Sequence, residues 1–215
     1  AAADRPVFIM TEDGLGKLQL PHFPLATSYA EVAEALDALL TEDHDFGTVV
    51  IDSVDWLEPL IWAEACQRNK WASIEAPGFG KGYAEALNVW REYLDKLNAL
   101  RDQKGMVVIQ IAHTDIKRFD SPEHEPYDRY VIKLQTRASV LLQEHSDVVL
   151  FANYQISVAK SDVGFNKKVT RALGSGARVM HTEERPAFLA KNRYGLPDTL
   201  PLSWAEFMAA MPQSE

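Results

Sequence analysis

Three polar side chains of this 215-residue chain each follow a mainly apolar run. They are Glu12, Asp52 and His113, which come after residues 7–10, 48–51 and 106–112. Continuous apolar runs are typical of buried parallel strands, and the carboxyl ends of such strands form the ligand crevice of an open α/β sheet. If the strands are neighbours, Glu12 could position a water, Asp52 could hold Mg²⁺, and His113 could donate to a phosphate.

Each of these side chains also has an ordinary structural explanation. Asp52 or Asp55 could simply cap the next helix, because Asp55 and Glu58 have the spacing of a capping box. Glu12 could be a solvated loop acid, and His113 a hydrogen-bonded imidazole at a strand end. For a lone histidine the structural explanation is the better one, but three polar groups after three buried strands are less easily explained as an accident. Ser53 adds a hydroxyl beside Asp52, and we count both among the candidate nucleotide contacts.

Helical patterns alternate with these strands, which predicts βαβ units in a parallel sheet with right-handed crossovers. Three helices are predicted in this part of the chain, over residues 28–40, 56–68 and 83–104. Ser28 and Glu31 form a capping-box pattern at the first helix, and Gly105 favours a stop after the third.

The second half of the chain is predicted to be less regular. Its expected elements are a charged loop over residues 117–128, a helix over 136–145, a strand over 147–159, a basic glycine-containing segment over 161–177, paired strands at 178–182 and 187–191, and a terminal helix over 204–211.

Composition excludes several classes of protein. With 47% hydrophobic and 25% charged residues, the chain can bury an ordinary globular core. The net charge of −9 argues against a uniformly basic surface but leaves room for a local basic patch. A single Cys66 rules out an internal disulfide framework. No apolar run is long enough to cross a membrane, and the first residues do not form a signal peptide, so we expect a cytoplasmic protein.

A complete phosphate loop does not occur in these residues. That loop needs the pattern Gly-x-x-x-x-Gly-Lys-Ser/Thr, so that backbone N–H groups cradle the phosphates and the hydroxyl reaches Mg²⁺. The Gly-Lys pairs within residues 14–18 and 78–82 lack both the first glycine and the hydroxyl. The chain starts without Met and reaches a strand at once. For an α/β ATPase, we therefore expect the first strand, phosphate loop and first helix to precede Ala1.

Five segments together carry a resemblance to a known family: residues 7–14 (VFIMTEDG), 48–57 (TVVIDSVDWL), 80–83 (GKGY), 111–113 (IAH) and 190–197 (AKNRYGLP). The chain resembles phage-encoded nucleotide-binding proteins of the RecA-core P-loop ATPase type, the Sak-type relatives of RecA, RadA and the Rad-type recombinases. The resemblance covers essentially the whole chain. It implies a single α/β domain over residues 1–215, with a RecA-like three-layer core, a mostly parallel sheet and an antiparallel C-terminal hairpin. The first strand, phosphate loop and first helix would be missing.

The resemblance also implies roles for individual residues toward ATP and Mg²⁺. Glu12 matches the catalytic glutamate, Asp52 the metal-associated acid and His113 the phosphate sensor. Lys191 and Arg193 match a pair of cations that such ATPases insert into the nucleotide site of a neighbouring subunit. This arrangement requires a homo-oligomer, either a ring or a filament. The alternative for Lys191 and Arg193 is a solvated edge strand.

The one basic concentration of the chain suggests contact with single-stranded DNA. Cations on a glycine-containing backbone can follow phosphates while an aromatic ring such as Phe165 stacks on a base. The cations concerned are Lys160, Lys167, Lys168, Arg171 and Arg178. Residues 117–129 form a second candidate loop of mixed charge. Both stretches could also be ordinary solvated loops.

We therefore expect ATP-linked binding of single-stranded DNA in homologous recombination or strand annealing, in the cytoplasm of a host that carries the phage or prophage. A phage single-strand binding protein is a further candidate partner, and no membrane partner is expected. The complete protein would hydrolyse ATP, whereas residues 1–215 alone would be inactive for lack of the phosphate loop. The alternatives are a nucleotide-regulated phage assembly or interaction protein with no DNA role, and a structural α/β domain without activity.

Overall fold

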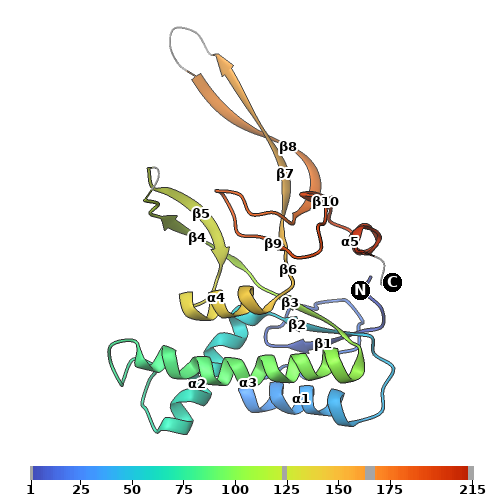
Figure 1. Cartoon of the computed structure of the whole chain (residues 1–215), viewed down its shortest axis with the longest axis vertical. Helices are drawn as coiled ribbons and strands as arrows, with labels where there is room; N and C mark the ends of the chain where they lie inside the picture. The colour runs from blue at the N-terminus through green and yellow to red at the C-terminus, as the bar shows by residue number, and fades with distance from the viewer. Residues whose placement is uncertain (1, 123–124, 163–167, 213–215) are drawn as a thin grey trace. The chain divides into compact units, whose positions relative to one another are not determined.

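A computed structural model describes residues 2–122, 125–162 and 168–212 of the chain (Figure 1). The chain forms two compact units, which we describe separately. The first consists of Ala1–Ile116 and Val131–His145, and the second of Lys117–Tyr130 and Ser146–Glu215.

The first unit is built on three parallel strands in the order β1-β2-β3: Pro6–Met10, Thr48–Asp52 and Val107–Ile111. Met10 pairs with Asp52, and Asp52 in turn pairs with Ile111, so the three strands end at the same level. The predicted neighbouring parallel strands are thereby confirmed. Because the ends are aligned, the residues that follow them lie along one edge of the sheet.

Helices cover one face of this sheet. They are α1 (Tyr29–Thr41), α2 (Val54–Asn69), α3 (Lys81–Lys104) and α4 (Thr136–His145). Their buried side chains form one apolar cluster with those of Val7, Ile9, Val49 and Ile51. No helix among the described residues is long and apolar enough to cross a membrane.

The opposite face of the sheet is covered by a connection rather than by a helix. Phe8, Met10 and Val50 point to this face and pack against Leu15 and Leu20, which lie between β1 and α1. The mixed α/β fold with a mostly parallel sheet is as predicted, while the RecA-like third layer stays a prediction.

The helix ends show which local signals hold. The hydroxyl of Ser28 accepts a hydrogen bond from the N–H of Glu31, as the capping box predicts. Gly105 ends α3 with a φ of 65°, a conformation that glycine adopts without steric cost. The alternative explanation of Asp55 as a helix cap is wrong, because α2 begins at Val54 and Asp55 lies inside its first turn.

The second unit is mainly antiparallel. β7 (Phe151–Asp162) pairs with β8 (Lys168–His181), and β10 (Thr199–Pro201) adds to the far end of β8. β6 (Val148–Val149) pairs with β9 (Lys191–Asn192). A short helix, α5 (Trp204–Ala210), follows β10.

Three expectations for the second half are corrected. Residues 168–177 are strand rather than loop, because this stretch pairs with residues 156–162 in a long hairpin. Residues 187–191 do not pair with 178–182, whose partner on that side is β10. The loop expected at 117–128 overlaps a second hairpin, formed by β4 (Thr114–Phe119) and β5 (Tyr127–Ile132).

Candidate active site

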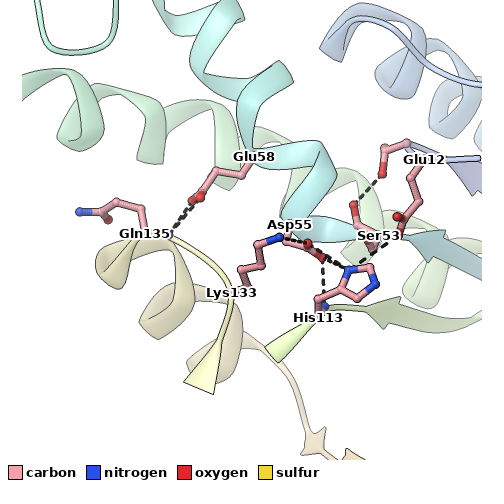
Figure 2. Close-up of polar contacts among 8 residues, drawn as sticks. Glu12, Ser53, Asp55, Glu58, His113, Lys133 and Gln135 are labelled. Carbon is pink, nitrogen blue, oxygen red and sulfur yellow. Dashed lines mark hydrogen bonds and ion pairs between the residues drawn. The ribbon is translucent and has the colours of Figure 1, made fainter. Parts of the chain in front are cut away.

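The polar side chains after the three strands lie close together in the first unit. The imidazole Nδ1 of His113 is 3.9 Å from Oε1 of Glu12 and 3.1 Å from Oδ2 of Asp55 (Figure 2). Asp52 lies near enough to Glu12 and His113 for both charges to act on its carboxyl group. The structure thus brings Glu12, Asp52 and His113 to one edge of the sheet, as their spacing predicts.

Backbone hydrogen bonds fix Glu12 beside Asp52. The N–H groups of Thr11 and Glu12 both donate to the carbonyl of Asp52, at 2.8 and 3.3 Å. The hydroxyl of Thr11 also donates to the carbonyl of Ser53 at 2.6 Å. The chain leaving β1 is therefore attached to the end of β2, which sets the position of the Glu12 side chain. Ser53 itself is fully buried, at 0% exposure.

The electrostatics around Asp52 suit a cation. Burial raises the pKa of Asp52, and the neighbouring Glu12 carboxylate raises it further, while His113 acts in the opposite direction. A carboxylate whose charge is disfavoured by burial and by a neighbouring acid is stabilised by a hard cation with oxygen ligands, such as Mg²⁺. Within the described residues, no group of three or more His, Cys, Asp or Glu side chains could hold a metal ion. Mg²⁺ at Asp52 would therefore share its coordination with nucleotide phosphates and water.

Asp55 is part of this site, although its sequence position suggested only a helix cap. Its side chain is 2% exposed and accepts hydrogen bonds from the backbone N–H of His113 at 3.0 Å and from the imidazole Nδ1. Burial acts to raise the pKa of Asp55, but the hydrogen bonds outweigh it and the pKa lies below its usual value. No local signal identifies this role, since the partner lies 58 residues away.

Lys133 is a second residue that the sequence did not single out. Its N–H donates to the carbonyl of His113 at 3.0 Å, and its Nζ lies 3.9 Å from Oδ2 of Asp55. Nearby, both carboxylate oxygens of Glu58 are 3.0 Å from the N–H of Gln135, just before α4 (Figure 2). Asp55 and Glu58, from the first two turns of α2, thus hold His113 and the segment just before α4.

Lys191 and Arg193 lie in the second unit, where each contacts the segment before β6. Nζ of Lys191 donates to the carbonyl of Ser146 at 2.7 Å. The guanidinium of Arg193 donates to the carboxylate of Asp147 at 2.8 Å. Both side chains of this ion pair are substantially exposed, so the pair contributes little to stability.

The basic residues are spread along the long hairpin. Arg178 stacks its guanidinium over the ring of Tyr154, 5.6 Å from the ring centroid, and Tyr154 is 53% exposed. Lys160 belongs to β7, and Lys168 and Arg171 belong to β8, but their side chains lie outside the described part of the structure. Lys167 lies outside the described residues altogether.

Comparison with known proteins gives one match. The family model of the AAA domain matches residues 1–194. This range includes Glu12, Asp52, His113, Lys191 and Arg193, and it spans the whole first unit and the second unit up to residue 194. No curated protein matches the chain, and neither does any solved structure.

Proposed function

The chain belongs to the AAA domain family, whose members are nucleotide-binding ATPases of the P-loop type, and we propose that it hydrolyses ATP at the edge formed by Glu12, Asp52 and His113. The observation that carries this proposal is the convergence of these three side chains after three aligned parallel strands. Each has the chemistry that phosphoryl transfer to water requires at that position.

In the proposed reaction, Glu12 accepts a proton from a water as the water oxygen attacks the terminal phosphorus of ATP. The bond from that phosphorus to the ADP oxygen breaks, giving ADP and phosphate. Mg²⁺ at Asp52 would neutralise charge on the phosphates. His113 would donate a hydrogen bond to the terminal phosphate, and its side chain is 55% exposed and therefore accessible.

We propose that two further parts of the site come from elsewhere. The sequence of residues 1–215 contains no complete phosphate loop, so the cradle for the phosphates would come from a segment outside these residues. Lys191 and Arg193 would act on the nucleotide of a neighbouring copy. Turnover would then depend on assembly into a ring or filament, because cations supplied in trans stabilise the transferring phosphoryl group.

We further propose that single-stranded DNA binds the β7–β8 hairpin, as expected of a phage-type recombination or annealing protein. Residues 151–181 contain five of the chain's 22 lysines and arginines but only one of its 31 aspartates and glutamates. The exposed Tyr154 ring, paired with the Arg178 guanidinium, offers a stacking surface next to a cation. This local charge stands out in a chain whose net charge is −9.

The proposal is tested by measuring Mg²⁺-dependent ATP hydrolysis with and without single-stranded DNA. The assay compares residues 1–215 with a chain extended upstream through a phosphate loop. Activity in the extended chain alone, raised by DNA, is the expected result. Absence of hydrolysis in both chains would contradict the proposed ATPase activity. ATP hydrolysis without salt-dependent DNA binding would favour the assembly or interaction protein instead.

A further inference from the structure

One buried carboxylate holds both the backbone and the side chain of His113. Oδ1 of Asp55 accepts the backbone N–H of His113 at 3.0 Å, while Nδ1 of the imidazole lies 3.2 Å from Oδ1 and 3.1 Å from Oδ2 (Figure 2). Two attachments to one residue fix its backbone position and its ring orientation together. Asp52 ends β2 and Asp55 lies in the first turn of α2, so the site acid and this contact belong to the same strand-to-helix connection.

The chemistry of this contact determines where the imidazole carries its proton. An ionised carboxylate can only accept hydrogen bonds, and the hydrogen bond made by one ring nitrogen fixes the state of the other. We infer that Asp55 is a positioning residue, which keeps the proton of the neutral His113 ring on Nδ1 and directs Nε2 to the ligand. The low pKa of Asp55 agrees with an ionised acceptor.

The other charged groups around the ring are consistent with this role. Glu12 comes from the connection after β1, Asp52 from the end of β2 and Lys133 from the chain after β5. Lys133 shares Asp55 with His113, because its Nζ lies 3.9 Å from the same carboxylate. Asp55 therefore holds two side chains that can carry positive charge, His113 and Lys133, at the edge of the sheet. The side chain of Lys133 is 60% exposed, which makes it a further candidate phosphate contact.

The consequence for the ligand rests on the proposed ATPase function. With Nδ1 committed to Asp55, a phosphate oxygen can meet the ring only through Nε2, which donates when the ring is an imidazolium. The charged ring then has ion-pair partners in Asp55 at 3.1 Å and Glu12 at 3.9 Å. Loss of Asp55 would leave the His113 ring free to rotate, so that Nε2 is no longer directed at the ligand, and would thereby weaken the response to the terminal phosphate.

The test is the ¹⁵N NMR spectrum of the histidine side chains in residues 1–215, with the His113 signals assigned from a His113→Gln variant. The wild type is expected to show the Nδ1–H tautomer at alkaline pH. Asp55→Ala should move His113 toward the Nε2–H tautomer, and Asp55→Asn should do so in part. Asp13→Asn, which removes an exposed acid next to Glu12, should change nothing. Because Asp55→Asn keeps the side-chain shape, it decides the question if Asp55→Ala does not fold.

A wild-type His113 already in the Nε2–H form, or one unchanged by both substitutions at Asp55, would overturn the inference. This readout needs no ATP, so it is independent of the proposed hydrolysis. In the extended chain, Asp55→Asn should also raise KM for ATP more than it lowers kcat. An unchanged KM with a clear tautomer shift would show that Asp55 positions His113 but that this positioning does not affect phosphate binding.

Discussion

The backbone of Gly14 lies directly against the carboxylate of Asp52. A Cβ at position 14 would be 3.3 Å from Oδ2 of Asp52 and 3.8 Å from Cγ of Glu12. The connection after β1 thus approaches the proposed Mg²⁺ ligand so closely that a side chain would press on it. Gly14 does not have a positive φ, so the close approach to Asp52 explains why a glycine suits this position.

Gly14→Ala is therefore expected to disturb Asp52 without unfolding the chain. The added methyl group should displace the carboxylate by a few tenths of an ångström. We expect about a tenfold loss of Mg²⁺-dependent ATP turnover in the extended chain, since a 1 Å misplacement can cost about a hundredfold. Titrating Mg²⁺ at saturating ATP measures the effect, and Asp13→Ala is the neighbouring control. Equal Mg²⁺ dependence in both variants would show that the close approach has no consequence.

Asp52→Asn and Asp55→Asn should change stability in opposite directions. Burial and Glu12 raise the pKa of Asp52, so its charge opposes folding at neutral pH, and Asp52→Asn should stabilise the chain. Asp55 has a lowered pKa, so its charge supports folding, and Asp55→Asn should cost about 1–3 kcal/mol as a buried hydrogen-bond partner is weakened.

Urea unfolding at neutral and acidic pH checks both signs. The benefit of Asp52→Asn should disappear as the pH falls below the ordinary range of Asp, where the wild-type carboxyl is neutral in both states. The cost of Asp55→Asn should persist to lower pH and vanish only when the folded-state carboxyl protonates. Two variants that shift stability in the same direction would show that the electrostatic account of these carboxyls is wrong.

Arg193 is expected to act on the nucleotide of a neighbouring subunit. Arg193→Ala and Glu12→Gln should each lose most ATP turnover in the extended protein. A mixture of the two variants should regain part of it, because a Glu12→Gln subunit can supply Arg193 to a partner that has an intact Glu12. Failure of the mixture to exceed either variant would contradict action in trans.

Asp147→Asn is the control for the contact that Arg193 makes within its own chain. The Arg193–Asp147 pair is exposed, so its loss should change stability by less than about 1 kcal/mol. Turnover should be maintained, since the guanidinium remains available. A loss of turnover as large as that of Arg193→Ala would mean that this ion pair is itself required.

The basic hairpin should carry the electrostatic part of DNA binding. Replacing Lys167, Lys168 and Arg171 with Ala should weaken binding of single-stranded DNA and lower the slope of log K against log salt by about 2, since each phosphate contact contributes about 0.7. Replacing Arg91, Arg101 and Lys104 of α3 removes equal charge from exposed positions elsewhere. An equal effect of both triple variants would show that binding depends only on the net charge of the chain. If the first triple variant has no effect, the DNA site lies elsewhere, and residues 117–129 are the next candidate.

The sequence predicts the sheet of the first unit well because its signals are local. Each of the three strands is a mainly apolar run, and Ser28 and Gly105 mark helix ends through short-range hydrogen bonds or backbone conformation. The position of Glu12, Asp52 and His113 at one edge of the sheet then follows from the parallel arrangement of the strands alone.

The features that the sequence does not predict depend on partners that lie far away along the chain. Asp55 looks like a cap within its own segment, and only the fold brings it to His113. Residues 168–177 look like a loop because of their glycines and charges, yet pairing with β7 makes them strand. The mainly apolar residues 187–191 suggest a strand beside residues 178–182, but the neighbouring edge of β8 is taken by β10.

The most direct test of the central claim is ATP turnover by Glu12→Gln in a chain extended through a phosphate loop. Gln keeps the size and the hydrogen-bonding oxygen of Glu12 but cannot take a proton from the attacking water. We predict that ATP binding persists while hydrolysis falls by about 10²–10⁴-fold, and that Asp13→Asn retains wild-type turnover. Hydrolysis by Glu12→Gln at the wild-type rate would contradict the proposed active site.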